Sequence, residues 1–183
     1  AADIGKKVTA MASLKKIIRT IVPKPLVSFY HFLLAQIGAV RFGFPSRELF
    51  VIAVTGTKGK SSTTEMLNAI LEEAGHTTAL LNSIRIKIGD QSEPNVSRMS
   101  MPGRFFIQRF LRNSVKKKCS IAILEMTSEG VKQYRHRCIE LSALIFTNLA
   151  PEHIESHGSY ESYADAKFEI GRQLVRSRKR HRT

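Results

Sequence analysis

The feature that most constrains the fold is an alternation of short apolar runs with helical patterns, which starts near residue 48. The first run, LFVIAV (residues 49–54), is uninterrupted, as in a strand buried on both sides. It passes through a glycine-containing turn into a helical pattern that ends at Gly75. Further strands are expected at 77–82, 84–88, 120–125 and 142–147, the last two buried, with helices over 104–118 and 161–175 and a polar loop from Asp90 to Pro102. This order predicts an α/β domain with a mostly parallel sheet and flanking helices.

Positive charge is concentrated at the two ends of the chain. The 183 residues carry a formal net charge of +14. Residues 1–47 contain eight Lys and Arg but one Asp, residues 176–183 contain five and no acid, and residues 48–175 are nearly balanced. We therefore expect a basic and apolar helical segment at 1–47, the α/β domain at 48–175 and a basic tail at 176–183. Basic ends are most often solvated, so no specific nucleic-acid partner is expected.

The composition is that of a globular protein, with 43% hydrophobic and 24% charged residues, which excludes disorder throughout. The two cysteines, Cys119 and Cys138, show neither a disulfide framework nor the spacing of zinc ligands. Reduced thiols of this kind indicate a cytoplasmic protein.

The N-terminal segment predicts two helices that are broken at Pro23 and Pro25. The run from residue 26 to residue 40 has no formal charge, but it is too short and too polar to be predicted as a membrane span. Five apolar side chains fall on one face of the second helix: Leu26, Tyr30, Leu33, Leu34 and Ile37. Two interpretations stay open, in which this face packs on the domain or lies on an anionic membrane as a peripheral contact.

The strongest chemical signal is the turn after the first strand. Glycines there let the backbone approach phosphate oxygens, and the N-terminus of the following helix supplies positive potential. Lys60 can reach the β- and γ-phosphates of a nucleotide, and Ser61 is placed to bind magnesium. The predicted phosphate-binding residues are Gly56, Thr57, Lys58, Gly59, Lys60, Ser61 and Ser62.

Three further groups point to the same end of the sheet. Glu125 ends a buried strand, where open α/β sheets bind ligands, and is a candidate magnesium ligand. The segment 147–158 follows a later strand and contains two histidines and two glutamates. Lys167 falls on the apolar stripe of the last helix, where a charged amine is costly to bury, so it either reaches solvent along its alkyl stem or faces the site.

Together these motifs resemble the Mur ligase family, most of all its UDP-N-acetylmuramoyl-tripeptide synthetase branch. VTGTKGKSSTTEML resembles the phosphate loop of the family, and EMTSEGVKQYR (125–135) is similar to its glutamate-led substrate segment. TNLAPEHIESHGSYESYADAK (147–167) is similar to the signature that contains a metal-binding histidine and a carbamoylated lysine. The resemblance implies the ATP-binding central domain, here with an incomplete sheet at the C-terminus, of a ligase in peptidoglycan precursor synthesis.

The same resemblance implies roles for individual residues. An intact enzyme of this type joins a carboxylate to an amino acid through an acyl-phosphate, with ATP, Mg2+ and a UDP-muramyl-peptide as ligands. Lys60 would stabilise the transferring phosphoryl group. Ser61 and Glu125 would hold one magnesium ion, and His153 with a carbamate on Lys167 would place a second. Ser100, Ser128 and Arg135 would bind the muramyl-peptide. Intact members have three domains, so this chain alone is expected to have weak activity or none.

Three alternatives stay open. A ligase similar to folylpolyglutamate synthase shares the phosphate loop, although the ending HGSYESYADAK favours the muramyl branch. A phosphate-loop NTPase or kinase could use Glu125 but gives no reason for Lys167 on an apolar stripe. A non-catalytic module that binds polyanions through its basic ends would depend steeply on salt and would not need Lys60.

Overall fold

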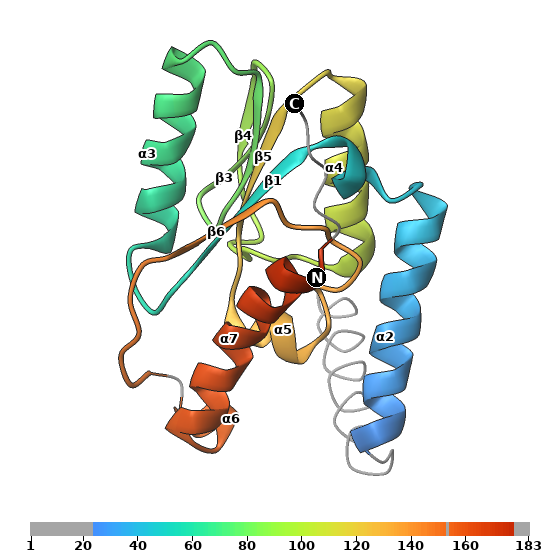
Figure 1. The fold of residues 1–183 in the computed structure, drawn as a ribbon, viewed down its shortest axis with the longest axis vertical. Coiled ribbons are helices and arrows are strands. Elements are labelled where there is room, and N and C mark those ends of the chain that lie inside the picture. The colour runs from blue at the N-terminus through green and yellow to red at the C-terminus, as the bar shows by residue number, and fades with distance from the viewer. Residues whose placement is uncertain (1–23, 153, 178–183) are drawn as a thin grey trace, which may run out of the picture.

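The computed structural model describes residues 24–152 and 154–177, which are built around one mixed sheet (Figure 1). The order of its strands is β4-β3-β2-β5-β1-β6. The strands are β1 (Phe50–Thr55), β2 (Thr78–Leu81), β3 (Arg85–Ile88), β4 (Gln91–Pro94), β5 (Ile121–Glu125) and β6 (Ala143–Phe146). β1 pairs in parallel with β5 and β6, and β2 in parallel with β5, whereas β3 is antiparallel to both of its neighbours. The predicted α/β class and mostly parallel sheet are confirmed.

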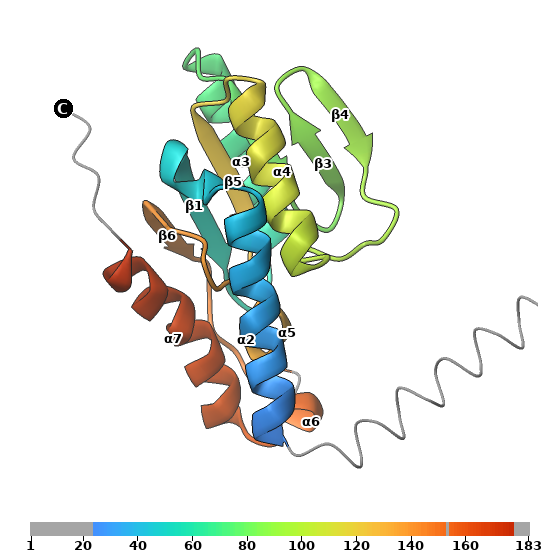
Figure 2. The same cartoon turned by 90° about the vertical axis from the view of Figure 1, so that its right-hand side faces the viewer.

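Helices cover both faces of this sheet. They are α2 (Lys24–Arg41), α3 (Lys60–Glu73), α4 (Arg104–Lys116), α5 (Ser128–Lys132), α6 (Ile154–His157) and α7 (Tyr160–Arg176), with a short 3-10 turn at Pro45–Glu48. Alternate β1 side chains enter two cores: Val51 and Ala53 pack with α4 and α7, whereas Ile52 and Val54 pack with the α3 side. α2 lies outside α4 as a further layer (Figure 2).

Two predictions about strands need correction. The run at 142–147 was predicted as a buried strand, but all four residues of β6 are only half-buried because β6 is at the edge of the described sheet. The predicted polar loop contains β4, which has four exposed residues and no apolar alternation. β4 forms because the chain reverses at Gly89, whose φ of +58° suits glycine, and then pairs antiparallel with β3.

The second predicted N-terminal helix is α2, whereas the first lies outside the described residues. α2 contacts α4 through the small residues Ala35 and Ala39, which are 1% and 0% exposed. The predicted apolar face is therefore not the face that packs on the domain, and Leu26, Tyr30, Leu33 and Ile37 are exposed. Within the described part of the chain, no helix combines the length and apolar character needed to cross a bilayer.

Candidate active site

The predicted phosphate loop connects β1 to α3 and depends on two glycines. Gly56 has a φ of +147°, and a Cβ atom there would lie 1.9 Å from the Thr147 hydroxyl. Gly59 precedes α3 with a φ of +79°, and a Cβ atom there would meet nothing within 4 Å. The first N–H groups of a helix lack partners within the helix, so the start of α3 presents donors beside the loop.

The segment after β6 holds the loop from the other side. Thr57 N–H donates to the Asn148 carbonyl at 3.0 Å, and Lys58 N–H donates to Asn148 Oδ1 at 3.0 Å. The Thr57 hydroxyl lies 2.8 Å from the hydroxyl of Tyr163 on α7. These contacts engage the N–H groups of Thr57 and Lys58, so the donors that remain for a phosphate begin at Gly59.

Glu125, at the end of β5, is 3% exposed and is surrounded by hydroxyl groups. Its Oε2 accepts from Ser61 Oγ at 2.8 Å and from Ser83 N–H at 3.1 Å, and its Oε1 accepts from Ser100 Oγ at 2.6 Å. The structure thus brings together Ser61 and Glu125, as the sequence predicted. Ser100, assigned by resemblance to the substrate, donates this hydrogen bond to Glu125 and also lines the cavity described below. Ser83 was not predicted, because it lies in a turn with no motif around it.

Two lysines approach the loop from opposite sides. Lys60 Nζ donates to the Thr57 carbonyl at 2.8 Å, and Lys167 Nζ donates to the Gly56 carbonyl at 2.6 Å. Lys167 is 2% exposed, and its Nζ lies 4.7 Å from the centre of the Tyr163 ring. Burial, with the charge of Lys60 as a second cause, lowers the pKa of Lys167 to about 8. The prediction that Lys167 faces inward is confirmed, and solvent exposure along its stem is not observed.

The predicted substrate residues come from α5 and the turn after it. Ser128 Oγ lies 3.1 Å from Nε2 of the buried His157, which is also 3.5 Å from Glu129 Oε1. Arg135 donates to the Met101 carbonyl and, at 2.7 Å, to Gln133 Oε1. Burial lowers the pKa of Arg135. His157 thereby connects α5 with α7, because its ring also packs edge-on against Tyr163 at 5.3 Å.

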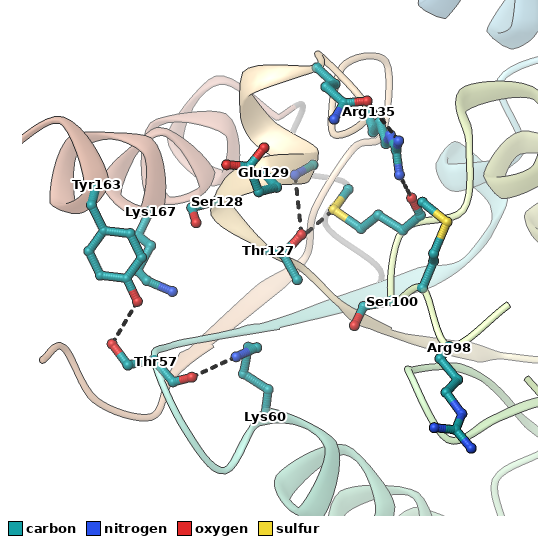
Figure 3. Close-up of a pocket in the computed structure, with 14 residues that line it drawn as sticks. Thr57, Lys60, Arg98, Ser100, Thr127, Ser128, Glu129, Arg135, Tyr163 and Lys167 are labelled. Atoms are coloured by element: carbon teal, nitrogen blue, oxygen red, sulfur yellow. Dashed lines mark hydrogen bonds between the residues drawn. The ribbon is translucent and has the colours of Figure 1, made fainter. Parts of the chain in front are cut away.

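Many of the residues described above line one cavity of about 360 Å³, whereas Ser61 and Glu125 are not part of its lining (Figure 3). Thr57 and Lys60 lie on one side of it, Tyr163 and Lys167 on a second, and Arg98 and Ser100 on a third. Its lining contains four basic side chains and a single acid: Lys60, Arg98, Arg135, Lys167 and Glu129. A cavity with this balance of charge is suited to an anionic ligand.

Not every predicted group can be placed. His153, the predicted metal-binding histidine, lies outside the described residues. Among the residues that are described, no cluster of three or more His, Cys, Asp or Glu side chains forms a metal site. Ser62 is exposed on the first turn of α3. Sequence reasoning missed Tyr163 and Asn148 as parts of the site, although both belong to the motif around residues 147–167.

The fold and the cavity define a phosphate-loop α/β domain, and comparison with known proteins identifies which one. The Mur ligase middle domain pattern matches residues 54–179. The chain therefore belongs to the Mur ligase family, as the middle-domain type.

Individual relatives agree with this assignment. A UDP-N-acetylmuramyl-tripeptide synthetase of Roseiflexus sp. (strain RS-1) is 33% identical over 144 residues, 78% of this chain and 28% of the relative. A UDP-N-acetylmuramoyl-L-alanyl-D-glutamate--2,6-diaminopimelate ligase of Geobacillus kaustophilus is 32% identical over 153 residues, 84% of this chain and 31% of the relative. The chain thus spans about three tenths of the length of these relatives.

Solved structures show the same fold. A structure of a UDP-N-acetylmuramoyl-L-alanyl-D-glutamate--2,6-diaminopimelate ligase superposes with a TM-score of 0.58 at 26% identity, over 67% of this chain and 24% of that chain. E. coli FolC in complex with DHPP and ADP superposes with a TM-score of 0.56 over 82% of this chain and 44% of that chain. Its identity is 20%, so it supports the fold alone.

Proposed function

We propose that this chain is the ATP-binding part of an ATP-dependent ligase that joins a carboxylate to an amino acid through an acyl-phosphate. The observation that carries the proposal is the contact of Ser61 with Glu125 at 2.8 Å, beside the phosphate loop. Lys60 of this loop and Lys167 of α7 both border a basic cavity. The named relatives support a UDP-muramyl-peptide as the carboxylate substrate. The unpaired thiols of Cys119 and Cys138 support a cytoplasmic location.

In this proposal the chain's own residues position phosphates and stabilise charge. Gly59 and the first turn of α3 direct N–H groups at the phosphates, and Lys60 leaves the Thr57 carbonyl to contact the transferring group. The substrate carboxylate attacks the γ-phosphorus of ATP, and ADP departs. The amine of the amino acid then attacks the acyl-phosphate, so an amide bond forms and phosphate leaves. Arg135 and Ser128, on the far side of the cavity, hold the muramyl-peptide.

The surroundings of Glu125 fit a magnesium ion. Among the described residues, the buried Glu125 carboxylate accepts hydrogen bonds from three neutral groups and forms no ion pair. Hard oxygen ligands of this kind are what Mg2+ prefers, so Ser61 and Glu125 would hold it. When bound, the ion would neutralise charge on the β- and γ-phosphates. We expect Glu125→Gln to weaken the dependence of ATP binding on Mg2+, measured by titration with and without the metal.

The environment of Lys167 supports its carbamoylation. Only the neutral amine attacks CO2, and a lowered pKa of about 8 raises the neutral fraction near neutral pH. The neutral amine forms a C–N bond to CO2 and loses one proton, which leaves an anionic carbamate in place of an amine; with His153 its oxygen would place a second ion. In 13C-bicarbonate, NMR should detect a carbamate signal in the wild type that Lys167→Arg lacks. Equal signals in the two proteins would contradict this assignment.

The test of the main proposal is calorimetric titration of Mg-ATP into the whole chain at moderate salt. We expect saturable binding that Lys60→Ala weakens by about tenfold or more, because the variant loses a charged contact to phosphate. Lys116→Ala is the matched control, since it removes an exposed lysine at the end of α4, away from the cavity. Equal loss in both variants would attribute binding to general positive charge, and absence of binding in a folded wild type would refute the proposal for this chain.

The acceptor separates the two ligase alternatives. We expect a UDP-muramyl-dipeptide, and not a folate, to bind to the ATP-loaded chain and to depend on Arg135. Binding of the folate instead would favour the folylpolyglutamate synthase type. Polyanion binding that falls steeply with salt and is equal in Lys60→Ala would favour the non-catalytic module.

A further inference from the structure

α2 has two unlike faces. The face toward α4 is made of small residues, Ala35, Gly38 and Ala39, all buried. A Cβ atom on Gly38 would lie 3.8 Å from the side chains of Phe105 and Gln108, so this face already makes close contact with α4. The domain therefore covers the small-residue side of the helix most completely.

The opposite face of α2, which we call the apolar stripe, is uncovered. Six large side chains on it are between 44% and 66% exposed: Leu26, Phe29, Tyr30, Leu33, Ile37 and Val40. In contrast, the polar side chains of Ser28, His31 and Gln36 are half-buried. Figures 1 and 2 show α2 as the outermost helix on its side of the molecule. Soluble proteins rarely expose a continuous apolar surface of this kind without a partner.

The charge of the sequence that contains the apolar stripe favours one class of partner. Residues 4–47 contain eight Lys and Arg and no Asp or Glu, and none of the eight falls between residues 25 and 40. Lys24 and Arg41 stand at the two ends of α2. A second copy of the chain would bring the same positive charge to the interface, which opposes self-association. A surface with negative charge next to an apolar layer suits both the apolar stripe and the positive charge of this part of the sequence.

We propose that the apolar stripe of α2 binds the surface of an anionic lipid bilayer. The aromatic and aliphatic side chains enter the boundary between headgroups and acyl chains, and Arg41, exposed at the end of α2, contacts lipid phosphates. The helix lies along the surface, with its small-residue face still packed on α4. This inference is independent of the ligase proposal, because it uses no residue of the cavity.

The test is sedimentation of the whole chain with vesicles of phosphatidylglycerol and phosphatidylcholine, compared with phosphatidylcholine alone. We expect binding to the anionic vesicles, weaker binding at higher salt, and little binding to the neutral ones. The double variant Phe29→Gln, Leu33→Gln should bind about tenfold more weakly or worse. The matched control is Met66→Gln, Ile70→Gln, which changes two exposed apolar side chains with the same spacing on α3.

Other outcomes overturn the proposal. Failure of the wild type to bind anionic vesicles does so directly, as does equal binding by the α2 variant and the wild type. A wild type that is dimeric in solution and does not bind vesicles, with a monomeric α2 variant, would show that a second copy covers the stripe. Thermal unfolding of each variant checks that the domain is intact, and since the changed side chains are exposed, the midpoints should stay close to that of the wild type.

Discussion

Burial of Lys167 predicts an unusual dependence of stability on pH. The pKa of this amine is lowered from 10.5 to about 8 in the folded chain. Between these values the unfolded chain holds a proton that the folded chain has released, so the free energy of unfolding rises with pH. From about pH 7.5 to about pH 9.5, this one group should contribute an increase of about 2 kcal/mol. For a lysine in a salt bridge the pKa is raised instead, and the free energy of unfolding would fall with rising pH.

The assay is urea unfolding followed by circular dichroism in CO2-depleted buffer, at both pH values. Other groups titrate in this range, so the quantity to compare is the difference between the wild type and Lys167→Met. As pH rises, the free energy of unfolding of the wild type should increase by about 2 kcal/mol more than that of Lys167→Met. Lys116→Met should show the same pH dependence as the wild type. A pH dependence that is the same in wild type and Lys167→Met would refute the argument that Lys167 is buried as an amine with a lowered pKa.

Three further predictions concern the loop and the core. Gly56→Ala should cost about 3 kcal/mol of stability, because the new Cβ would clash with Thr147. Gly59→Ala should cost about 1 kcal/mol, because its Cβ meets no neighbour and only the left-handed backbone is strained. Equal urea midpoints for the two variants would contradict this. Asn148→Ala removes the side-chain contacts with Lys58 and so frees the phosphate loop. Calorimetry should show ATP binding about tenfold weaker, with a loss of stability of only about 1 kcal/mol because Asn148 is exposed. Unchanged affinity would show that these contacts have no role in binding. His136 has no hydrogen-bond partner among the described residues, and burial lowers its pKa to about 4. The stability present above pH 6.5 should therefore decline as pH falls toward 4. Acid unfolding curves of His136→Phe should lack this part of the decline.

The central part of the fold could be predicted from the sequence because local and global signals agree there. The run before the phosphate loop is apolar at every position from Val51 to Val54, and a strand with helices on both faces of its sheet buries such a run completely. β4 could not be predicted from hydrophobicity, since its four residues are exposed and depend on pairing with β3. The Gly89-Asp90 pair, a known hairpin turn, was the available signal.

The candidate site was predictable where a residue follows a strand, and less so where tertiary contacts decide. Ser61 and Glu125 meet because β1 and β5 are adjacent and parallel, which places their carboxyl ends together. Ser83 joins them through its position in a turn after β2, and no spacing rule connects it with Glu125. The inward direction of Lys167 followed from helical periodicity, but its contact with the Gly56 carbonyl could be known only from the structure.

The edge position of β6 has a consequence for motion. In the described sheet β6 pairs with β1 alone, yet the segment that follows it holds Thr57 and Lys58 through Asn148 and leads into the helix that contains Lys167. A strand supported on one side opens more readily than a central one. The half of the site on β6 and α7 should therefore exchange its amide hydrogens faster than the half on β1 and β5. A nucleotide that binds only when Asn148 holds the loop would slow that exchange. Amide exchange in β6 and α7 would then report the same equilibrium between open and held loop that governs nucleotide binding.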